Sequence, residues 1–136
     1  LNKLKKALKA GFKKLASWAY RRVLKRRGSR ILSETGSDYL FTVVVPIYNV
    51  EPYLEETLDS IVGQTVGFRD NIQLVLVNDG SPDDSGAICR RYLERYPENV
   101  VYVEQENAGV GAACNAGLAL ARGAFVNFMG ADDKWS

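Results

Sequence analysis

Apolar runs of strand length alternate along this chain with segments whose apolar residues recur every three or four positions. Runs rich in β-branched residues cover 41–46, 72–78, 100–104 and 124–129, and their length is typical of strands. Helical spacing follows them over 51–64, 84–96 and 110–122. In the first of these helical segments, Leu54, Leu58 and Ile61 fall on one face. The pattern predicts strands and helices in strict alternation.

This alternation indicates an α/β fold with a parallel, Rossmann-like sheet and flanking helices. Strands that are apolar throughout are expected where helices cover both faces of a sheet, and parallel neighbours need helical crossovers. Local signals support the helices: Pro52 suits a first turn, Asp83 or Asp84 can cap the second helix, and Gly123 can end the third. No internal repeat is present.

The first 30 residues differ from the rest in charge. They hold 12 of the 18 Lys and Arg residues and no acid, whereas residues 31–136 hold 6 basic and 16 acidic residues, a net charge of −10. From Leu1 to Val23 apolar residues recur at helical spacing, which predicts a basic amphipathic helix over 1–30. A linker is expected over 31–40, and the α/β segment over 41–136.

The basic segment suggests an anionic membrane surface as a partner through residues 1–27. Lys and Arg near such a surface are attracted to it, while Trp18 and Phe12 suit the interface. The alternative is an extension that packs on another part of the protein with solvated lysines. Nucleic acid is not expected, because the following segment is acidic and lacks a recognition module. We therefore expect a cytoplasmic protein, peripheral on the inner face of the membrane.

The chemistry is restricted by composition. The chain of 136 residues has no His, which excludes the usual serine and cysteine triads and HExxH zinc sites. Cys89 and Cys114 do not form a CxxC motif, so neither a metal cluster nor a disulfide scaffold is indicated and a reducing compartment is expected. No run of about 18 uncharged apolar residues, the length a membrane span needs, occurs. Carboxylates must therefore carry most of any chemistry.

Polar residues gather where the predicted strands end. Tyr48 follows the first strand, Asp79 the second, and Asp132 and Asp133 the fourth. Ligands of open parallel sheets bind beyond the carboxyl ends of the strands. The Tyr48 ring could stack on a base, and Asp79 could accept a hydrogen bond from it. Asp132 and Asp133 offer the oxygen ligands that Mg²⁺ or Mn²⁺ prefers. Together these side chains suit a nucleoside diphosphate bound with a metal. Alternatively, these Asp and Asn residues are turn and cap residues.

Five motifs in register resemble the nucleotide-binding half of family-2 glycosyltransferases of the GT-A fold. They comprise Val43-Val44-Val45-Pro46-Ile47-Tyr48-Asn49, the helical stretch 53–65, the stretch 75–85 with Asn78-Asp79-Gly80-Ser81, the stretch 105–117 and Gly130-Ala131-Asp132-Asp133. The resemblance spans 42–134. It implies transfer of a sugar, usually with inversion, from a nucleotide-sugar donor, often UDP-linked, to an acceptor hydroxyl. A glycan or a lipid-linked molecule is the expected acceptor.

The resemblance also implies site residues. Pro46, Tyr48, Asn78, Asp79 and Ala131 would border the nucleotide, and Asp132 would ligate Mn²⁺ or Mg²⁺. No catalytic residue is assigned, because the family's acceptor half with its general base should lie after residue 136, so the chain alone is expected to be inactive.

Three positions depart from the family pattern. Gly130 stands where the first Asp of the DxD motif is usual, Cys114 where an Arg is common, and Asn78 where an Asp is common. A catalytically degenerate nucleotide-binding or scaffold module, tethered by its basic helix, is therefore the alternative function. An NAD-dependent oxidoreductase is a weaker one, because the stretch 109–114 resembles GxGxxG/A but follows the third strand rather than the first.

Overall fold

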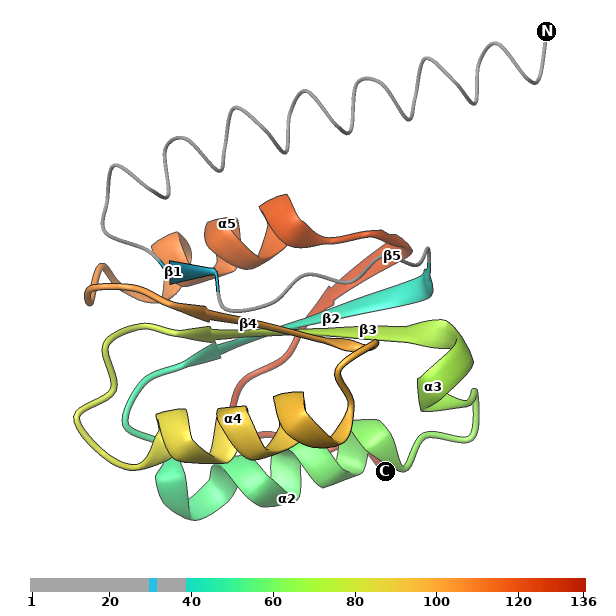
Figure 1. The fold of residues 1–136 in the computed structure, drawn as a ribbon, viewed down its shortest axis with the longest axis horizontal. Helices are drawn as coiled ribbons and strands as arrows, with labels where there is room; N and C mark the ends of the chain where they lie inside the picture. The colour runs from blue at the N-terminus through green and yellow to red at the C-terminus, as the bar shows by residue number, and fades with distance from the viewer. Residues whose placement is uncertain (1–29, 32–38) are drawn as a thin grey trace, which may run out of the picture.

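The structure is a computed structural model that describes residues 30–31 and 39–136. These residues form a five-stranded sheet with helices on both faces (Figure 1). In chain order the elements are β1 (Arg30–Ile31), β2 (Tyr39–Ile47), α2 (Glu51–Val62), α3 (Phe68–Asn71), β3 (Ile72–Asn78), α4 (Ser85–Arg95), β4 (Val100–Glu104), α5 (Val110–Leu120) and β5 (Gly123–Phe128).

The sheet has the strand order β1-β4-β3-β2-β5. Strands β4, β3, β2 and β5 are parallel, with Val44 of β2 opposite Val75 of β3 and Phe128 of β5. Only the two-residue β1 runs antiparallel, against β4. The predicted α/β class with a parallel sheet is therefore confirmed.

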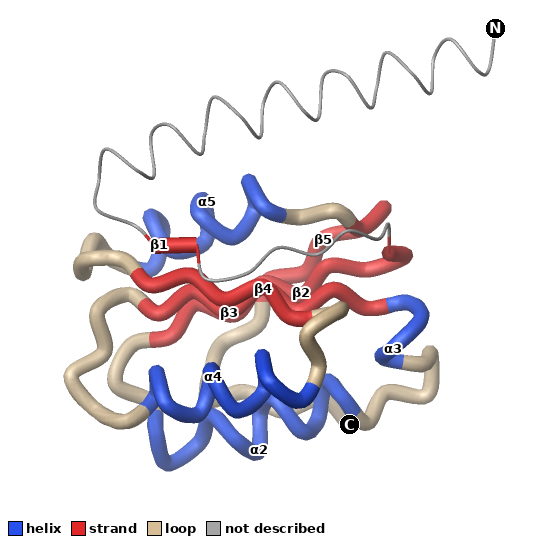
Figure 2. Tube along the Cα trace, viewed as in Figure 1, coloured by secondary structure: helices blue, strands red, loops and turns tan. Residues whose placement is uncertain are grey.

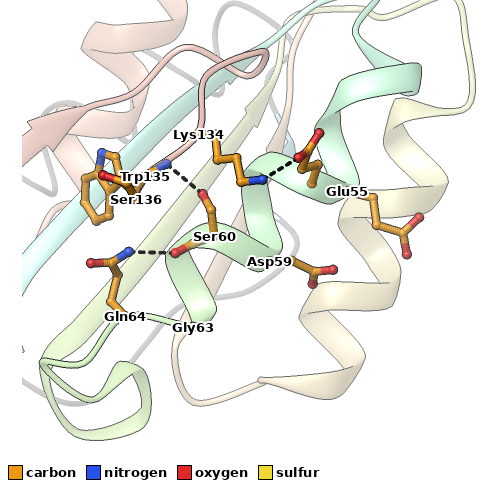
Figure 3. A pocket seen from close by; sticks show the side chains of 9 residues that line it. Glu55, Asp59, Ser60, Gly63, Gln64, Lys134, Trp135 and Ser136 are labelled. Carbon is orange, nitrogen blue, oxygen red and sulfur yellow. Dashed lines mark hydrogen bonds and ion pairs between the residues drawn. The ribbon is translucent and has the colours of Figure 1, made fainter.

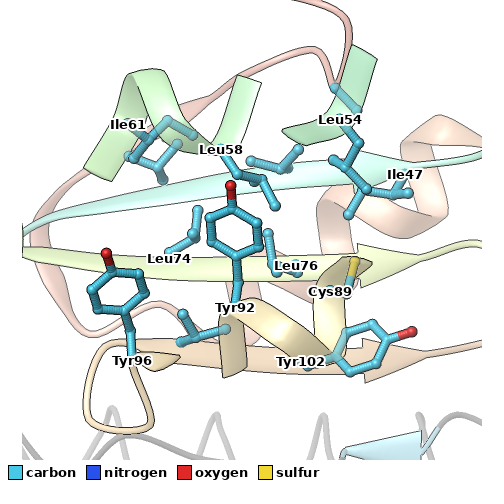
Figure 4. Packing of buried hydrophobic residues seen from close by; sticks show 14 of the residues in the cluster. Ile47, Leu54, Leu58, Ile61, Leu74, Leu76, Cys89, Tyr92, Tyr96 and Tyr102 are labelled. Carbon is cyan, nitrogen blue, oxygen red and sulfur yellow. The ribbon is translucent and has the colours of Figure 1, made fainter. Parts of the chain in front are cut away.

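Helices form a layer on each face of the sheet (Figure 2). Helices α2 and α4 cover one face, where the larger apolar cluster includes Leu58, Leu76 and Tyr92 (Figure 4). Helix α5 covers the other face over β2 and β3, and its Ala113 and Ala116 pack with Val44 and Val75. Small residues on α5 allow the helix to approach the sheet closely.

The structure differs from the sequence prediction at several boundaries. The short elements β1 and α3 were not predicted, and β2 begins at Tyr39, two residues before the expected start. Gly123 does not end a helix, because α5 stops at Leu120 and Gly123 begins β5. Its role is close approach: a Cβ atom there would lie 2.4 Å from the backbone nitrogen of Thr42.

Strand β5 is the exception to the expectation of buried strands. It lies at the edge beside β2, and only Gly123 among its residues is buried. Phe125 is 61% exposed and Phe128 48% exposed. The physical reason is that α5 packs on β2 and β3, leaving the side chains of β5 uncovered.

The predicted basic helix over 1–30 and most of the linker over 31–40 lie outside the described residues. Within the linker's expected bounds, Ile31 belongs to β1 and residues 39 and 40 begin β2. Across residues 30–31 and 39–136, none of the helices combines the length and the apolar character that crossing a bilayer requires.

Candidate functional site

The loops that follow β2, β3 and β4 lie together at one end of the sheet (Figure 2). Parallel pairing explains this arrangement, because it brings the carboxyl ends of neighbouring strands to the same edge. In register, Pro46 lies opposite Val77 and Ile47 opposite Asn78. Asp79 follows directly, and its backbone N–H donates a 2.8 Å hydrogen bond to the Ile47 carbonyl. The predicted residues of β2 and β3 are thus neighbours.

Asp79 joins the loops that follow β3 and β4. Its side chain is 3% exposed. Oδ1 accepts hydrogen bonds from Gln105 Nε2 at 2.8 Å and from the Ala108 backbone N–H at 2.9 Å, while Oδ2 accepts one from the Gly109 N–H at 2.9 Å. The carboxylate therefore holds the segment that leads into α5.

Gly80 permits this close approach of the two loops. Its φ is +71°, a left-handed conformation that L side chains rarely adopt, and a Cβ atom there would lie 2.9 Å from the backbone nitrogen of Asn107. Both the backbone conformation and the lack of space thus require glycine at this position.

Asn78 is embedded in a polar network and is 8% exposed. Its Oδ1 accepts a 2.9 Å hydrogen bond from the Ser81 N–H, and its Nδ2 donates one of 3.1 Å to the Tyr102 hydroxyl. Tyr102 in turn donates to Glu104 Oε1 at 2.9 Å, and Arg90 pairs with the same carboxylate. Burial raises the pKa of Tyr102, so its hydroxyl keeps its proton. The Asn78 amide is thus engaged through both of its polar atoms.

Tyr48 projects at the end of β2 and is 51% exposed. The backbone after it is held by Ser81, whose hydroxyl accepts from the Asn49 N–H at 3.2 Å and donates to the Ile47 carbonyl at 3.3 Å. Asn49 has a positive φ of 53°, a conformation that Asn tolerates better than most residues. An exposed ring on a fixed backbone can offer a flat apolar surface to a ligand.

The N-terminal ends of α2 and α4 bind each other. Asp83 Oδ2 accepts a 3.0 Å hydrogen bond from the Glu51 N–H, and Glu51 Oε2 accepts one of 3.1 Å from the Asp84 N–H. Burial acts to raise the pKa of Asp83, but hydrogen bonds from Ser85 and Glu51 lower it below its ordinary value. Of the two predicted cap residues, Asp84 holds the N-cap position without a side-chain cap bond, whereas Asp83 accepts from the Ser85 N–H.

Beyond β5 the chain forms a turn that carries the acidic pair. The Asp133 N–H donates a 3.1 Å hydrogen bond to the Gly130 carbonyl, which closes the turn. The buried Thr57 hydroxyl of α2 lies 2.9 Å from the Ala131 carbonyl and 2.7 Å from the Asp133 carbonyl. Ala131 is buried, whereas Asp132 and Asp133 are exposed. Helix α2 therefore fixes the backbone and leaves both carboxylates accessible.

Two further contacts hold the segment after this turn on α2 (Figure 3). The Trp135 N–H donates to Ser60 Oγ at 3.1 Å, and Lys134 Nζ lies 2.6 Å from Glu56 Oε1. This pairing raises the pKa of Lys134 and lowers that of Glu56. A pocket of about 550 Å³ lies between this segment and α2. It extends along α2 to Gly63 and Gln64 and is separate from the edge where the strands end.

A second pocket, of about 400 Å³, lies at the carboxyl edge of the sheet. Its lining includes Asn78, Gly80, Ser81, Asp83, Arg90 and Gln105. These residues come from the loop after β3, the first turns of α4 and the end of β4. The pocket therefore adjoins the loops that Asp79 and Asn78 hold in place.

The donor set at the acidic turn fits a divalent cation. Across residues 30–31 and 39–136 no three His, Cys, Asp or Glu side chains are grouped to hold a metal. Mg²⁺ is commonly bound through one or two carboxylates, with phosphate oxygens and water completing its shell. Asp132 and Asp133 offer two exposed carboxylates of this kind on a fixed turn.

The structure thus brings four of the predicted nucleotide-binding residues to one edge, at the ends of β2 and β3: Pro46, Tyr48, Asn78 and Asp79. The fifth, Ala131, follows β5 and lies against Thr57 of α2. The positions of Thr57, Tyr102 and Gln105 in this arrangement were not predicted. Thr57 and Gln105 lie within the motifs that carry the family resemblance, but the sequence around them does not indicate which atoms they contact. Tyr102 lies within an apolar run and reads as a core residue.

Fold and site together define a class: an α/β domain with polar loops at the carboxyl edge of a parallel sheet and an acidic turn after strand β5, as in GT-A glycosyltransferases. Residues 42–136 match the family model for glycosyl transferase family 2. The chain belongs to this family.

Relatives and solved structures support the assignment. The minor teichoic acid biosynthesis protein GgaB of Bacillus subtilis (strain 168) is 50% identical over 102 residues, which cover 75% of this chain and 11% of GgaB. The crystal structure of residues 1–349 of Staphylococcus aureus TarS with UDP is 33% identical and matches with a TM-score of 0.63, covering 69% of this chain and 28% of that one.

A third similarity concerns a structure that contains a metal. The mannosyltransferase PcManGT of Pyrobaculum calidifontis, in complex with GDP-Man and Mn²⁺, is 32% identical with a TM-score of 0.65, covering 95% of this chain and 38% of that one. This chain therefore spans well under half the length of each of these proteins. The oxidoreductase interpretation is wrong, because the family is one of glycosyltransferases.

Proposed function

We propose that this domain binds a UDP-sugar donor together with Mn²⁺ or Mg²⁺ in a protein that transfers the sugar, with inversion, to a hydroxyl of a glycan or lipid-linked acceptor. The observation that carries the proposal is the placement of Tyr48 and Asp79 at the neighbouring carboxyl ends of β2 and β3, and the acidic turn with Asp132 that follows the parallel strand β5 supports it. The similarity to TarS, whose structure contains UDP, supports UDP as the nucleotide.

The nucleotide would lie over the ends of β2 and β3. Pro46 and Tyr48 border it, and the exposed Tyr48 ring is suited to stacking on the base. Asp79 Oδ2 has a single N–H partner and can accept another hydrogen bond from the base. Asn78 serves this site through Ser81, since both ends of its amide are engaged. Ala131, in the acidic turn, would border the nucleotide through its backbone.

Asp132 is the proposed metal-binding residue. When bound, the cation neutralises negative charge that develops on the departing diphosphate. Thr57 would hold the acidic turn on α2, so that the Asp132 carboxylate keeps its position. Carboxylates without a cation would repel a diphosphate, which makes nucleotide binding metal-dependent.

Calorimetric titration of the full chain with UDP, with and without Mn²⁺, tests the proposal. We expect Mn²⁺-dependent binding of UDP that Asp132→Asn abolishes. Asp70→Asn is the matched control, because Asp70 is an exposed carboxylate of α3, which leads into the start of β3, at the opposite end of that strand from Asn78 and Asp79. GDP is the informative comparator, since PcManGT binds GDP-Man, and tighter binding of GDP than UDP would replace the proposed nucleotide.

Two outcomes would contradict the proposal. A folded protein that binds no nucleotide with Mn²⁺ would favour the catalytically degenerate or scaffold module. Binding that survives Asp132→Asn unchanged would remove Asp132 from the metal site.

Residues 1–27 are proposed to contact an anionic membrane, which would place the domain at the inner, cytoplasmic face. The basis is their charge: the first 30 residues hold 12 Lys and Arg and no acid. We expect the full chain to sediment with anionic vesicles at low salt and to dissociate at high salt. The charge-reversed variant Lys5→Glu, Lys6→Glu, Lys9→Glu should lose binding, and equal binding to neutral vesicles would contradict an electrostatic contact.

A further inference from the structure

The chain enters the sheet at the edge that carries the proposed donor site. Strand β1 pairs antiparallel with β4, with Arg30 opposite Glu104 and Ile31 opposite Val103. Glu104 is the last residue of β4, so β1 begins at the carboxyl end of the parallel strands. Figure 1 shows β1 beside the loops at this end of the sheet, whereas α3 lies at the other end. The residues that precede Arg30 are therefore joined to the domain at its carboxyl edge.

The sheet topology explains this point of entry. Strand β2 begins at Tyr39, which lies opposite Gly123 at the start of β5, so the chain has to reach the amino end of the parallel strands before it enters β2. The antiparallel β1 runs in that direction, from the carboxyl end toward the amino end.

Positive charge is concentrated immediately before β1. Six of the 12 basic residues in the first 30 positions fall within 21–30, with no acid among them: Arg21, Arg22, Lys25, Arg26, Arg27 and Arg30. Chain connectivity keeps the Cα atom of Arg27 within about 11 Å of that of Arg30. The end of the basic segment is thus tied to the carboxyl edge.

The rest of the chain has the opposite charge. Residues 31–136 carry a net charge of −10, so an anionic surface repels the body of the domain and attracts only the segment before β1. Attraction therefore acts at the carboxyl edge, and repulsion turns the remainder away. The carboxyl edge becomes the part of the domain nearest to the surface, and α3 at the amino end becomes the farthest.

We propose that the basic residues before β1 hold the domain with its carboxyl edge, and hence the donor site, toward an anionic membrane. The inference rests on the proposed function, because it combines the membrane contact of residues 1–27 with the donor site. Of the two acceptor classes, it selects the lipid-linked one, whose hydroxyl is held at the bilayer surface that the donor site faces.

Fluorescence quenching by nitroxide-labelled lipid headgroups tests this orientation on the full chain. A fluorophore is attached to Glu106→Cys, in the loop after β4, or to Asp70→Cys in α3, and both variants remove one exposed acid. Cys114→Ala is present in both. Cys89 stays unlabelled, because burial raises its pKa to about 12 and only the thiolate reacts.

The vesicles contain phosphatidylcholine and phosphatidylglycerol in equal parts. We expect a clear loss of fluorescence at residue 106 and none at residue 70, because β3 alone separates the two ends of the sheet by about 20 Å. Circular dichroism verifies that each variant is folded.

Lengthening the connection tests the cause of the orientation. A flexible Gly-Ser insert of about 20 residues between Gly28 and Ser29 adds an average reach of about 25 Å. The variant should sediment with the vesicles as the parent protein does, whereas quenching at residue 106 should fall to the level at residue 70. Undiminished quenching would overturn the role of the connection.

The outcomes separate this inference from the proposed function. Vesicle binding with equal quenching at both positions, or with stronger quenching at residue 70, would overturn the orientation and the choice of a lipid-linked acceptor, and would leave the membrane contact intact. Absence of binding to anionic vesicles would overturn both. Nucleotide binding, measured by calorimetry without vesicles, does not depend on either result.

Discussion

Gly117 of α5 lies directly against Val44 of β2, so closely that a Cβ atom on Gly117 would come 2.2 Å from Val44 Cγ1. Both residues are buried, at the centre of the layer between α5 and the sheet. This contact sets how near α5 approaches β2. Because the loop that Asp79 holds leads into α5, the contact also influences the candidate site.

Gly117→Ala should therefore destabilise the fold. The added methyl group forces α5 away from β2, and overpacking of this kind costs about 1–3 kcal/mol. The free energy of unfolding from denaturant titration measures the effect. Gly111→Ala is the matched control on the same helix, because nothing lies within 4 Å of a Cβ there, and it should be neutral or stabilise by up to about 1 kcal/mol. Equal effects of the two substitutions would contradict the packing argument.

Asp79→Asn should lower both stability and nucleotide affinity. The carboxylate accepts from Gln105, Ala108 and Gly109, and an amide would direct its own N–H groups at one of these donors. A buried donor left without an acceptor costs about 1–3 kcal/mol. Thermal denaturation and calorimetry with UDP measure the two losses. The prediction fails if Asp79→Asn resembles Asp70→Asn in both measurements.

Asn78→Asp, which introduces the residue common in the family, should be destabilising here by about 1–3 kcal/mol. A carboxylate can still accept from Ser81, but it cannot donate to the Tyr102 hydroxyl as Asn78 Nδ2 does. A double-mutant cycle with Tyr102→Phe checks this cause, because the cost of Asn78→Asp should shrink once the hydroxyl is absent. If Asn78→Asp destabilises the Tyr102→Phe background as much as the wild type, the lost hydrogen bond to Tyr102 is not the cause of the destabilisation.

The hydrogen bonds of Asp83 should appear in the acid limb of the stability profile. Its pKa is lowered in the folded state from the ordinary value of 3.8, so the unfolded chain binds a proton more readily. The stabilisation is present above the unfolded pKa and is lost as the pH falls through the folded one. Free energies of unfolding measured from pH 7 down to about pH 2, below the usual range of carboxyl titration, should draw together for wild type and Asp83→Asn as the pH falls below 3.8. A constant difference across this range would exclude the mechanism.

The sequence alone determined the strand and helix alternation, the parallel sheet and the family. These features depend on patterns local to each segment: continuous apolar runs for β2, β3 and β4, and helical spacing for α2, α4 and α5. Parallel pairing then placed Tyr48 and Asp79 at one edge as a geometric consequence, before any contact was known. The family resemblance marked Asp132 in the same way.

Only the tertiary structure decided which atoms these residues contact. Asp79 binds amides 29 and 30 residues further along the chain, and Thr57 holds the turn at Asp133 from 76 residues away. No local pattern encodes such pairs, because they arise from the packing of loops brought together by the sheet. For the same reason the exposure of β5 was not predicted. An apolar run shows that a strand has side chains suited to burial, but whether they are buried depends on where α5 packs.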